Sequence, residues 1–162
     1  MNSTEDGRED NLRIRKAVIK DVQQIHRLIN DQAGRGLMLP RALNEIYTTI
    51  RDHFVCEVDG TIVGVCALHI LWEDLAEIRS LAISDPFQHK KIGTRLVRRC
   101  INEARRLGVR RVFALTYVPE FFRSLGFRDL DKSELPHKIW SDCVKCHKFP
   151  DCDEHALIRD VL

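Results

Sequence analysis

The sequence has no hydrophobic stretch long enough to cross a membrane. Its longest apolar run covers residues 62–71, contains a glycine and a histidine, and falls short of the roughly 20 residues that a membrane helix needs. Residues 1–10 are polar and acidic, without the apolar segment of a secretory signal. We therefore expect a cytoplasmic protein that has no membrane partner.

An excess of charge of either sign is also missing. The chain has 26 Lys and Arg residues against 24 Asp and Glu residues, and this net charge of +2 does not indicate a nucleic-acid binder. Hydrophobic residues make up 44% of its 162 positions and charged residues 31%, a mixture typical of a globular protein. The length predicts one domain over residues 12–162, after a disordered leader over residues 1–11.

The six cysteines do not indicate a disulfide framework, because a cytosolic chain keeps its thiols reduced. Three of them fall within apolar strand or helix patterns, where we expect small buried hydrophobic side chains. These are Cys56, Cys66 and Cys100.

The other three cysteines lie in an irregular, polar loop over residues 129–154. They are Cys143, Cys146 and Cys152, with His137, His147 and His155 nearby. Three thiolates and one imidazole would form a tetrahedral zinc site that fixes this loop. Free, reduced thiols at the surface are the alternative, and the sequence leaves both open.

The spacing of apolar residues predicts alternating strands and helices. Strand patterns cover residues 12–18, 53–58, 61–71, 75–83, 109–116 and 156–162. Helical spacing covers residues 21–31, 40–52, 90–107 and 119–125. Asp59-Gly60 favours a hairpin between the second and third strands. The order of these elements is that of a single mixed α/β domain.

The connection from the fourth predicted strand to the third predicted helix is the part most informative about function. A helix N-terminus presents unpaired N–H groups and the positive end of the helix dipole. Gly93 lets an anion approach the backbone, and Lys90, Lys91 and Arg95 add positive charge. This combination suits a pyrophosphate, although the P-loop and dinucleotide-binding glycine spacings are both absent. A solvated, basic helix start is the alternative.

This connection resembles the Q/R-x-x-G-x-G/A signature of the GCN5-related N-acetyltransferases through Gln88-x-x-Lys91-x-Gly93. Residues 119–127, an aromatic-rich helix ending in Gly-Phe, are similar to the second landmark of that family. The resemblance implies a central mixed, mostly antiparallel, splayed sheet flanked by helices. Lys91 replaces the first glycine of the signature. A lysine is tolerated there if the backbone stays helical, and is unfavourable if φ must be positive.

The resemblance also implies that acetyl-CoA is the donor. Backbone groups of the strand before the signature are expected to pair with its pantetheine arm: Leu81, Ala82 and Ile83. The pyrophosphate is expected at the following loop and helix start: Gln88, His89, Lys90, Lys91, Ile92, Gly93 and Thr94. Members of the family often have a β-bulge in this strand, and the apolar pattern suggests an extra residue near Arg79-Ser80.

Four further segments resemble the acetyltransferase domain of N-acetylglutamate synthases, in particular the short bacterial forms that lack an amino-acid-kinase domain. These are residues 39–41, 66–72, 76–83 and 112–116. The resemblance implies acetyl transfer to the α-amine of L-glutamate, the first step of arginine biosynthesis. The alternatives are a different amino acid, a polyamine or a protein N-terminus as acceptor, or a non-catalytic module that binds CoA or zinc. The sequence leaves the oligomeric state open, a homodimer included.

The expected acceptor, glutamate, has two carboxylates and one amine. Arginine binds carboxylates through a bidentate fork, and Arg41 and Arg79 are the candidates that the resemblance favours. Glu77 is the candidate general base, which takes the amine proton directly or through a water. Ordinary ion pairing of all three residues is the alternative. The tyrosine that serves many relatives as general acid is replaced by Phe122, with Tyr117 a weak substitute.

Overall fold

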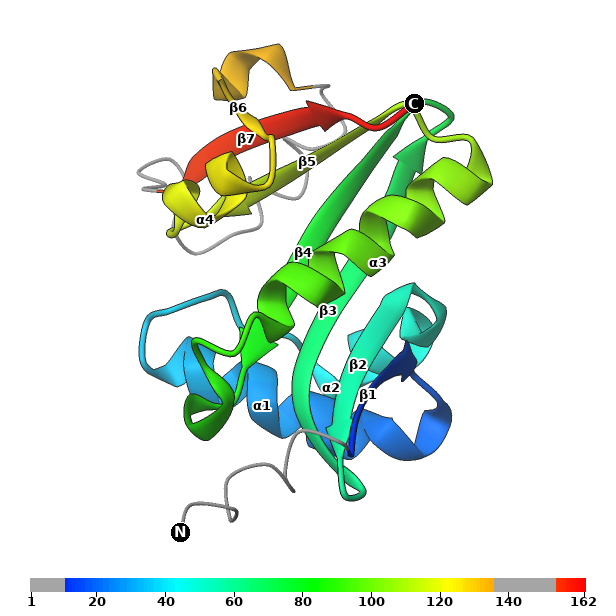
Figure 1. Ribbon diagram of the computed structural model, residues 1–162, viewed down its shortest axis with the longest axis vertical. Coiled ribbons are helices and arrows are strands. Elements are labelled where there is room, and N and C mark those ends of the chain that lie inside the picture. Colours follow the sequence, from blue (N-terminus) through cyan, green and yellow to red (C-terminus); the bar gives the residue numbers. More distant parts are fainter. Residues whose placement is uncertain (1–10, 136–153) are drawn as a thin grey trace, which may run out of the picture. The chain divides into compact units, whose positions relative to one another are not determined.

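The computed structural model describes residues 11–135 and 154–162 (Figure 1). Its strands are β1 (Leu12–Lys16), β2 (His53–Val58), β3 (Thr61–Trp72), β4 (Leu75–Ile83), β5 (Arg111–Thr116), β6 (Arg128–Leu130) and β7 (His155–Asp160). Its α-helices are α1 (Val22–Gly34), α2 (Leu43–Thr48), α3 (Ile92–Leu107) and α4 (Pro119–Ser124). Short 3₁₀ turns are η1 (Ile19–Asp21), η2 (Ile50–Asp52), η3 (Asp85–Phe87) and η4 (Lys132–Glu134). No helix in these two ranges is both long and apolar enough to span a membrane.

The seven strands form one mixed sheet in the order β1-β2-β3-β4-β5-β7-β6. The pairs β1–β2, β2–β3, β5–β7 and β6–β7 run antiparallel, whereas β4 and β5 run parallel. The parallel ladder joins residues 75–77 to residues 111–113 and, within the described chain, extends no further along either strand. The expected mixed, mostly antiparallel sheet flanked by helices is confirmed.

The domain divides into two compact units. The first contains the described residues up to Leu68 together with Ser80–Cys100. The second contains His69–Arg79 together with the described residues from Ile101 onward. β4 and α3 therefore each contribute residues to both units, and each unit has its own hydrophobic cluster.

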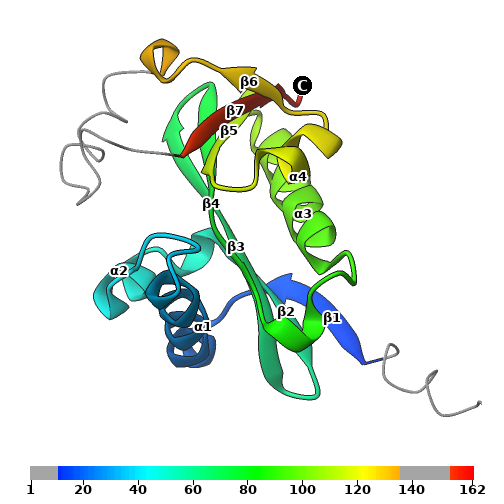
Figure 2. The same cartoon turned by 90° about the vertical axis from the view of Figure 1, so that its left-hand side faces the viewer.

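In the first unit, α1 and α2 cover one face of β2 and β3, and the first half of α3 covers the other (Figure 2). Ile25 and Ile29 are one helical turn apart on α1, so both point toward the sheet. They join Ile46 of α2 and Val55 and Val65 of the strands in one buried cluster. The apolar stripe of α1, which repeats about every 3.6 residues, thus packs on the inward-facing side chains of the strands, which alternate every two residues.

Gly64 of β3 sets how closely α3 approaches the other face. A Cβ at this position would lie 3.1 Å from Ile83 Cδ1 and 3.2 Å from both Ile92 Cγ2 and Leu96 Cδ1. These contacts are tighter than ordinary van der Waals separations, so the absence of a side chain is what lets the start of α3 pack here. Ile92 and Leu96 are one turn apart and fully buried.

Cys66 and Cys100 belong to the same interface between β3 and α3. Their Sγ atoms are 3.7 Å apart, and both side chains are fully buried, as is that of Cys56 on β2. The expectation that these cysteines are small buried hydrophobic residues is confirmed. The hydrogen bond with Cys100 and burial raise the pKa of the Cys66 thiol, and burial raises that of Cys56 to about 11.

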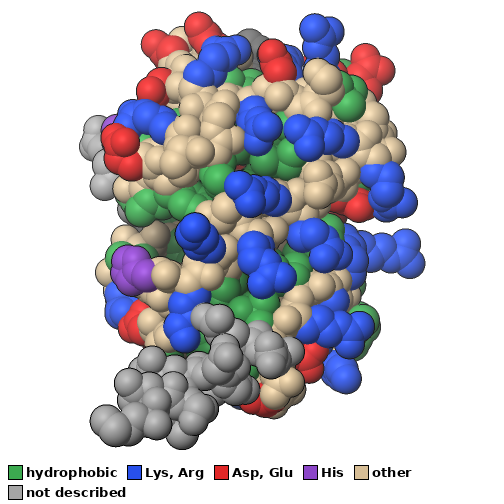
Figure 3. Space-filling view, viewed as in Figure 1, with side chains coloured by type: hydrophobic (Ala, Val, Ile, Leu, Met, Phe, Trp, Pro, Cys, Tyr) green, Lys and Arg blue, Asp and Glu red, His purple; other side chains and the backbone are tan. Residues whose placement is uncertain are grey.

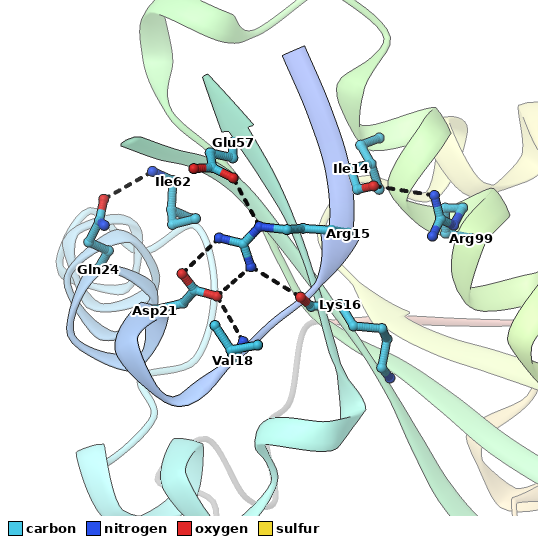
Figure 4. A network of polar contacts seen from close by, with 9 residues as sticks. All are labelled: Ile14, Arg15, Lys16, Val18, Asp21, Gln24, Glu57, Ile62 and Arg99. Atoms are coloured by element: carbon cyan, nitrogen blue, oxygen red, sulfur yellow. Dashed lines mark hydrogen bonds and ion pairs between the residues drawn. The ribbon is translucent and has the colours of Figure 1, made fainter. Parts of the chain in front are cut away.

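Arg15 joins the first strand to the first helix (Figure 4). Its guanidinium donates to both carboxylate oxygens of Asp21 at 2.7 and 2.9 Å, and its Nε donates to Glu57 at 2.9 Å. The Asp21 carboxylate also accepts the N–H of Val18 at 2.8 Å, and it is only 3% exposed. The hydrogen bond from Arg15 holds the pKa of Asp21 below its ordinary value, although burial alone would raise it. This network fixes the turn between β1 and α1.

In the second unit, the hydrophobic cluster contains Leu75, Phe113 and Ile158. α4 adds a separate aromatic group. The ring of Phe122 lies edge-on at 5.1 Å from Phe121 and 5.2 Å from Phe127. Phe122 is 3% exposed, so its ring packs in the interior of this unit.

Two helix starts differ from those predicted. The helix predicted from Pro40 begins at Leu43, because the backbone of Arg41 is bound by a side chain of α1. The helix predicted from Lys90 begins at Ile92, because Lys91 has a left-handed backbone. The predicted irregular loop also begins later than residue 129, since β6 and η4 occupy its first residues.

Candidate active site

The candidate donor site begins at the end of β4. Ser80 lies within this strand but has φ +59, so the extended backbone is interrupted there. This interruption is at the position where the sequence predicts an extra residue. The next three residues are the ones expected to meet the pantetheine arm: Leu81, Ala82 and Ile83. Ala82 packs into the first hydrophobic cluster, whereas its two neighbours are half-buried.

The loop from β4 to α3 passes twice through left-handed backbone. His89 has φ +63 and Lys91 has φ +62, while Gln88 is extended. A left-handed residue followed by a helical one turns successive N–H groups toward one point, which creates a concave anion site. The unpaired N–H groups of the first turn of α3, from Ile92, continue this arrangement. The backbone around residues 88–94 can therefore turn N–H groups toward an anion, which is the arrangement that the sequence predicts for a pyrophosphate.

Lys91 does not have the helical backbone that would make a lysine harmless at this place in the signature. At φ +62 its Cβ approaches the following carbonyl oxygen, which costs about 1 kcal/mol or somewhat more. The glycine of the family signature would adopt the same φ without that cost. Of the two cases that the sequence left open for Lys91, the structure has the unfavourable one, so the lysine introduces local strain in the loop.

Three side chains, two of them at the end of α1 and one in the loop itself, hold the end of β4 and the start of the loop. The carbonyl of Ile83 accepts from the amides of Gln32 on α1 and of Gln88, the latter at 3.3 Å. The carboxylate of Asp85 accepts from both terminal nitrogens of Arg35 at 3.0 Å and from Gln88 at 3.2 Å. The side chain of Gln88, the first signature residue, therefore binds the loop itself. The Ile83 carbonyl is likewise already engaged within the protein.

Positive side chains surround the start of α3 (Figure 3). Lys90, Lys91, Arg95 and Arg98 are all exposed. Among the described residues, none of the four forms an ion pair, and Lys90 instead lies 5.6 Å from the centre of the Phe87 ring. The positive charge near the loop is thus available to an external anion, as the sequence predicts.

The two acceptor-site candidates on β4 contact each other in the second unit. Arg79 Nε donates to Glu77 Oε1 at 2.8 Å, and the side chains are 19% and 12% exposed. Residues two apart on a strand share a face, which explains the contact. The structure thus brings together the predicted base and one predicted carboxylate ligand.

Arg41, the third acceptor-site candidate, belongs to the first unit. Asn30 of α1 holds its backbone from both sides, accepting its N–H at 3.2 Å and donating to its carbonyl at 2.9 Å. The guanidinium lies 3.6 Å from Glu45 and is 28% exposed, so the pair is loose and open to solvent.

His53 is buried, and burial lowers its pKa below the ordinary value.

Residues 22–127 match the acetyltransferase (GNAT) family. The matched range contains the whole loop, the start of α3 and the β4 ion pair. The chain belongs to this family. It is therefore an acyltransferase that uses acetyl-CoA, and the alternative of a non-catalytic module is set aside.

Several known acetyltransferases are similar to this chain in sequence, and one of the solved structures is also similar in fold. An uncharacterised N-acetyltransferase of Chlorobaculum tepidum is 39% identical over 146 residues, which covers 90% of this chain and 94% of that protein. The amino-acid acetyltransferase of Mycobacterium tuberculosis is 32% identical, covering 83% of this chain and 78% of that protein. The N-acetylglutamate synthase of Neisseria gonorrhoeae, solved with coenzyme A and N-acetyl-glutamate, superposes with a TM-score of 0.85 at 30% identity. This superposition covers 93% of this chain but 35% of that one, so the chain spans about a third of the synthase.

The tyrosine position that the resemblance gives for a general acid holds no acidic group in this structure. That position is Phe122, whose ring is buried in the aromatic group of α4 and carries no proton to donate. Tyr117 is half-buried directly after β5. It stays a candidate from the sequence.

The predicted zinc ligands Cys143, Cys146 and Cys152 lie outside the described residues. Within the described ranges, no three His, Cys, Asp or Glu side chains are grouped so that they could hold a metal ion. The zinc hypothesis therefore stays a prediction from the sequence.

The sequence analysis did not identify the residues of α1 that bind the candidate donor loop, the connection between β4 and α3 over residues 84–91. Gln32 follows Ile25 and Ile29 on the buried stripe of this helix and is itself 6% exposed. A glutamine in an apolar stripe needs a hydrogen-bond partner. That mismatch was the signal in the sequence, but it could not name Ile83 as the partner, 51 residues away.

Proposed function

We propose that this acetyltransferase transfers the acetyl group of acetyl-CoA to the α-amine of L-glutamate, producing N-acetyl-L-glutamate and CoA. The observation that carries the proposal is the likeness to the gonococcal synthase over 93% of this chain, in a complex that contains both CoA and N-acetyl-glutamate. The resemblance to a mycobacterial amino-acid acetyltransferase supports an amino acid as the acceptor. We assign the reaction to arginine biosynthesis in the cytoplasm.

The donor binds at the end of β4 and the loop that follows. The thioester arm pairs with backbone groups of Leu81, Ala82 and Ile83, although the Ile83 carbonyl is shared with two side-chain amides. The pyrophosphate accepts N–H groups of residues 88–94. Lys90, Lys91 and Arg95 supply the opposite charge. Anions are stabilised at a helix N-terminus by unpaired N–H groups and by the helix dipole, which supports this placement.

The acceptor has one amine and two carboxylates, and each needs a partner. Arg41 and Arg79 are assigned to the carboxylates, because guanidinium forms paired hydrogen bonds with them. The Nε of Arg79 is already used by Glu77, while its two terminal nitrogens have no partner among the described residues. These two nitrogens can form the fork that a carboxylate accepts.

Glu77 is assigned as the base. It takes a proton from the ammonium group of the acceptor, directly or through a water, and the freed nitrogen attacks the thioester carbon. The negative charge that develops on the carbonyl oxygen is stabilised by backbone N–H groups near Leu81. The C–S bond then breaks, and CoA leaves as a thiolate, which needs little help because a thiol has a pKa of about 8.5. A dedicated general acid is therefore not required.

The test measures CoA release from acetyl-CoA with a panel of amines: L-glutamate, other amino acids, a polyamine and a peptide N-terminus. We expect rapid thiol release with L-glutamate and detection of N-acetyl-L-glutamate by mass spectrometry. Release with another amino acid and none with glutamate would overturn the substrate but keep the acetyltransferase. That outcome is the second candidate, because the 39% identical relative from Chlorobaculum has no characterised acceptor.

A further inference from the structure

The C-terminal part of α1 makes two contacts to the segment that precedes the donor loop. Gln32 donates its amide to the carbonyl of Ile83, the last residue of β4. Arg35, directly after the helix, forms a two-pronged ion pair with Asp85, with both N–O distances 3.0 Å. All four residues belong to the first compact unit. The base of the loop is therefore attached to a helix that contributes no residue to the signature.

These two contacts differ in strength because they differ in burial. Gln32 is 6% exposed, and a buried hydrogen bond that loses one partner leaves the other group unsatisfied at a substantial cost. The side chains of Arg35 and Asp85 are 44% and 61% exposed, and ion pairs in water contribute little and weaken with salt. The buried amide is thus the main attachment and the ion pair the secondary one.

The same two acceptors also hold the first residue of the signature. The amide of Gln88 donates to the Ile83 carbonyl and to the Asp85 carboxylate, so it completes the contacts that α1 begins. His89 and Lys91 follow at once with positive φ, a backbone that persists only when its surroundings hold it. If the Ile83 end of the loop moves, Gln88 and the N–H groups behind it move with it.

We propose that Gln32 is a positioning residue for acetyl-CoA. Its amide fixes the end of β4 and thereby pre-orders the N–H groups that receive the pyrophosphate, while Arg35 adds a weaker, salt-sensitive contribution. Pre-ordering a binding loop improves affinity because the free protein has already lost the conformational freedom that binding requires. The inference rests on the donor-loop part of the proposed function, and it does not depend on which amine is acetylated.

The decisive variant is Gln32→Met, which keeps the length and volume of the side chain but cannot donate a hydrogen bond. We expect the Kd for coenzyme A, measured by titration calorimetry on the full chain, to rise about tenfold. We expect a similar rise in KM for acetyl-CoA, with kcat at saturating acetyl-CoA within about twofold of the parent. The matched control is Gln23→Met on the exposed side of the same helix, which should leave both constants unchanged.

A role in packing alone gives a different result. In that case Gln32→Met would change the thermal midpoint and leave the coenzyme A affinity as in the parent, and this outcome overturns the inference. If Gln32→Met does not fold, Arg35→Gln replaces it, since an ion pair this exposed contributes little to stability. We expect a rise in Kd of about threefold at low salt that disappears at 0.5 M salt. An Arg35→Gln protein with unchanged affinity at low salt would equally overturn it.

Failure of the inference and failure of the donor site are distinguishable. If the parent protein gives no saturable heat with coenzyme A, the donor site itself is wrong. If the parent protein and Gln32→Met bind coenzyme A equally well, the donor site stands and only the positioning role of Gln32 falls.

Discussion

Glu77 and Arg79 form a largely buried ion pair on one face of β4, with 2.8 Å between Oε1 and Nε. Glu57 and Arg15 form a second pair of the same kind, with 2.9 Å between Oε2 and Nε. Both pairs join a glutamate to an arginine Nε and are largely buried, although Arg15 also binds Asp21. Only the first pair lies on the strand that leads to the donor loop. This makes the second pair a matched control for any catalytic role of the first.

Glu77→Gln should lower kcat by about a hundredfold or more, because a positioned general base accelerates a reaction by at least about that factor. The loss should be largest near neutral pH, where the acceptor amine is protonated, and should shrink at high pH. Glu57→Gln should leave kcat unchanged. A Glu77→Gln enzyme with the pH–rate profile of the parent would exclude Glu77 as the base and leave it the ordinary partner of Arg79.

Arg41→Ala and Arg79→Ala should each raise the KM for L-glutamate about tenfold or more, with little change in the KM for acetyl-CoA. Loss of a charge-assisted hydrogen bond to a carboxylate costs about 1.5–3 kcal/mol, which is the basis for this figure. Arg106→Ala is the control, since that side chain is 71% exposed and pairs with Glu103. Steady-state kinetics with each substrate varied in turn makes the test, and unchanged glutamate kinetics in both variants would refute the assignment.

Lys91→Gly should stabilise the ligand-free protein by about 0.5–1 kcal/mol, because the gain from relieving a left-handed side chain exceeds the entropy cost of glycine. Lys91→Ala removes the same charge but keeps the strain, so it separates the two effects. Urea denaturation measures the stability and calorimetry the coenzyme A affinity. Equal stability of the two variants would mean that the loop relaxes to another backbone when the lysine is absent.

Gly64→Ala should destabilise the protein by about 1–3 kcal/mol, the usual cost of adding a methylene-sized group to a packed core. The new methyl group would meet Ile83, Ile92 and Leu96 at 3.1–3.2 Å and push the start of α3 away from β3. Gly34→Ala, whose Cβ would meet nothing within 4 Å, is the control. A thermal midpoint as high as that of the parent would contradict the tight packing at this point.

Acid should weaken the protein through Asp21. Its pKa is lower in the folded state than in the unfolded chain, so the unfolded chain binds the extra proton first. The stabilisation from Asp21 is therefore complete above about pH 4 and is lost as the pH falls through the folded-state pKa. Asp21→Asn should lose about 3 kcal/mol at pH 7 and show a flatter dependence on pH below 4. Denaturant titrations at several pH values measure both, and an equally steep acid loss in the variant would assign it to other carboxylates.

Local patterns in the sequence were enough for much of the fold. The Asp59-Gly60 hairpin is one case: both residues have positive φ, +50 and +80, as the tight turn between twisted strands requires. The amphipathic stripe of α3 is another, since its apolar residues from Ile92 to Ala104 are buried, and only Leu107 at the end of the helix is exposed. These features depend on neighbours in the sequence, and therefore residue type and spacing predict them.

Contacts between distant residues decided the rest. The start of α2 was misplaced because Asn30, 11 residues earlier, binds the backbone of Arg41 and keeps it out of the helix. The sequence shows that Lys91 is strained if its φ is positive, but it does not show the sign of φ, because the residue type does not fix the backbone angle. The support of the donor loop by Gln32 joins segments 51 residues apart, and no local pattern carries that information.

The thiols between β3 and α3 have a practical consequence for studying motion. Cys66 and Cys100 are fully enclosed, so a soluble alkylating reagent reaches them only when this seam of the molecule opens. The rate at which these two cysteines are alkylated, measured by mass spectrometry, then reports how often the structure opens beneath the first half of α3. Bound coenzyme A should lower this alkylation rate in proportion to its occupancy, because a ligand that binds only the closed form lowers the population of the open one.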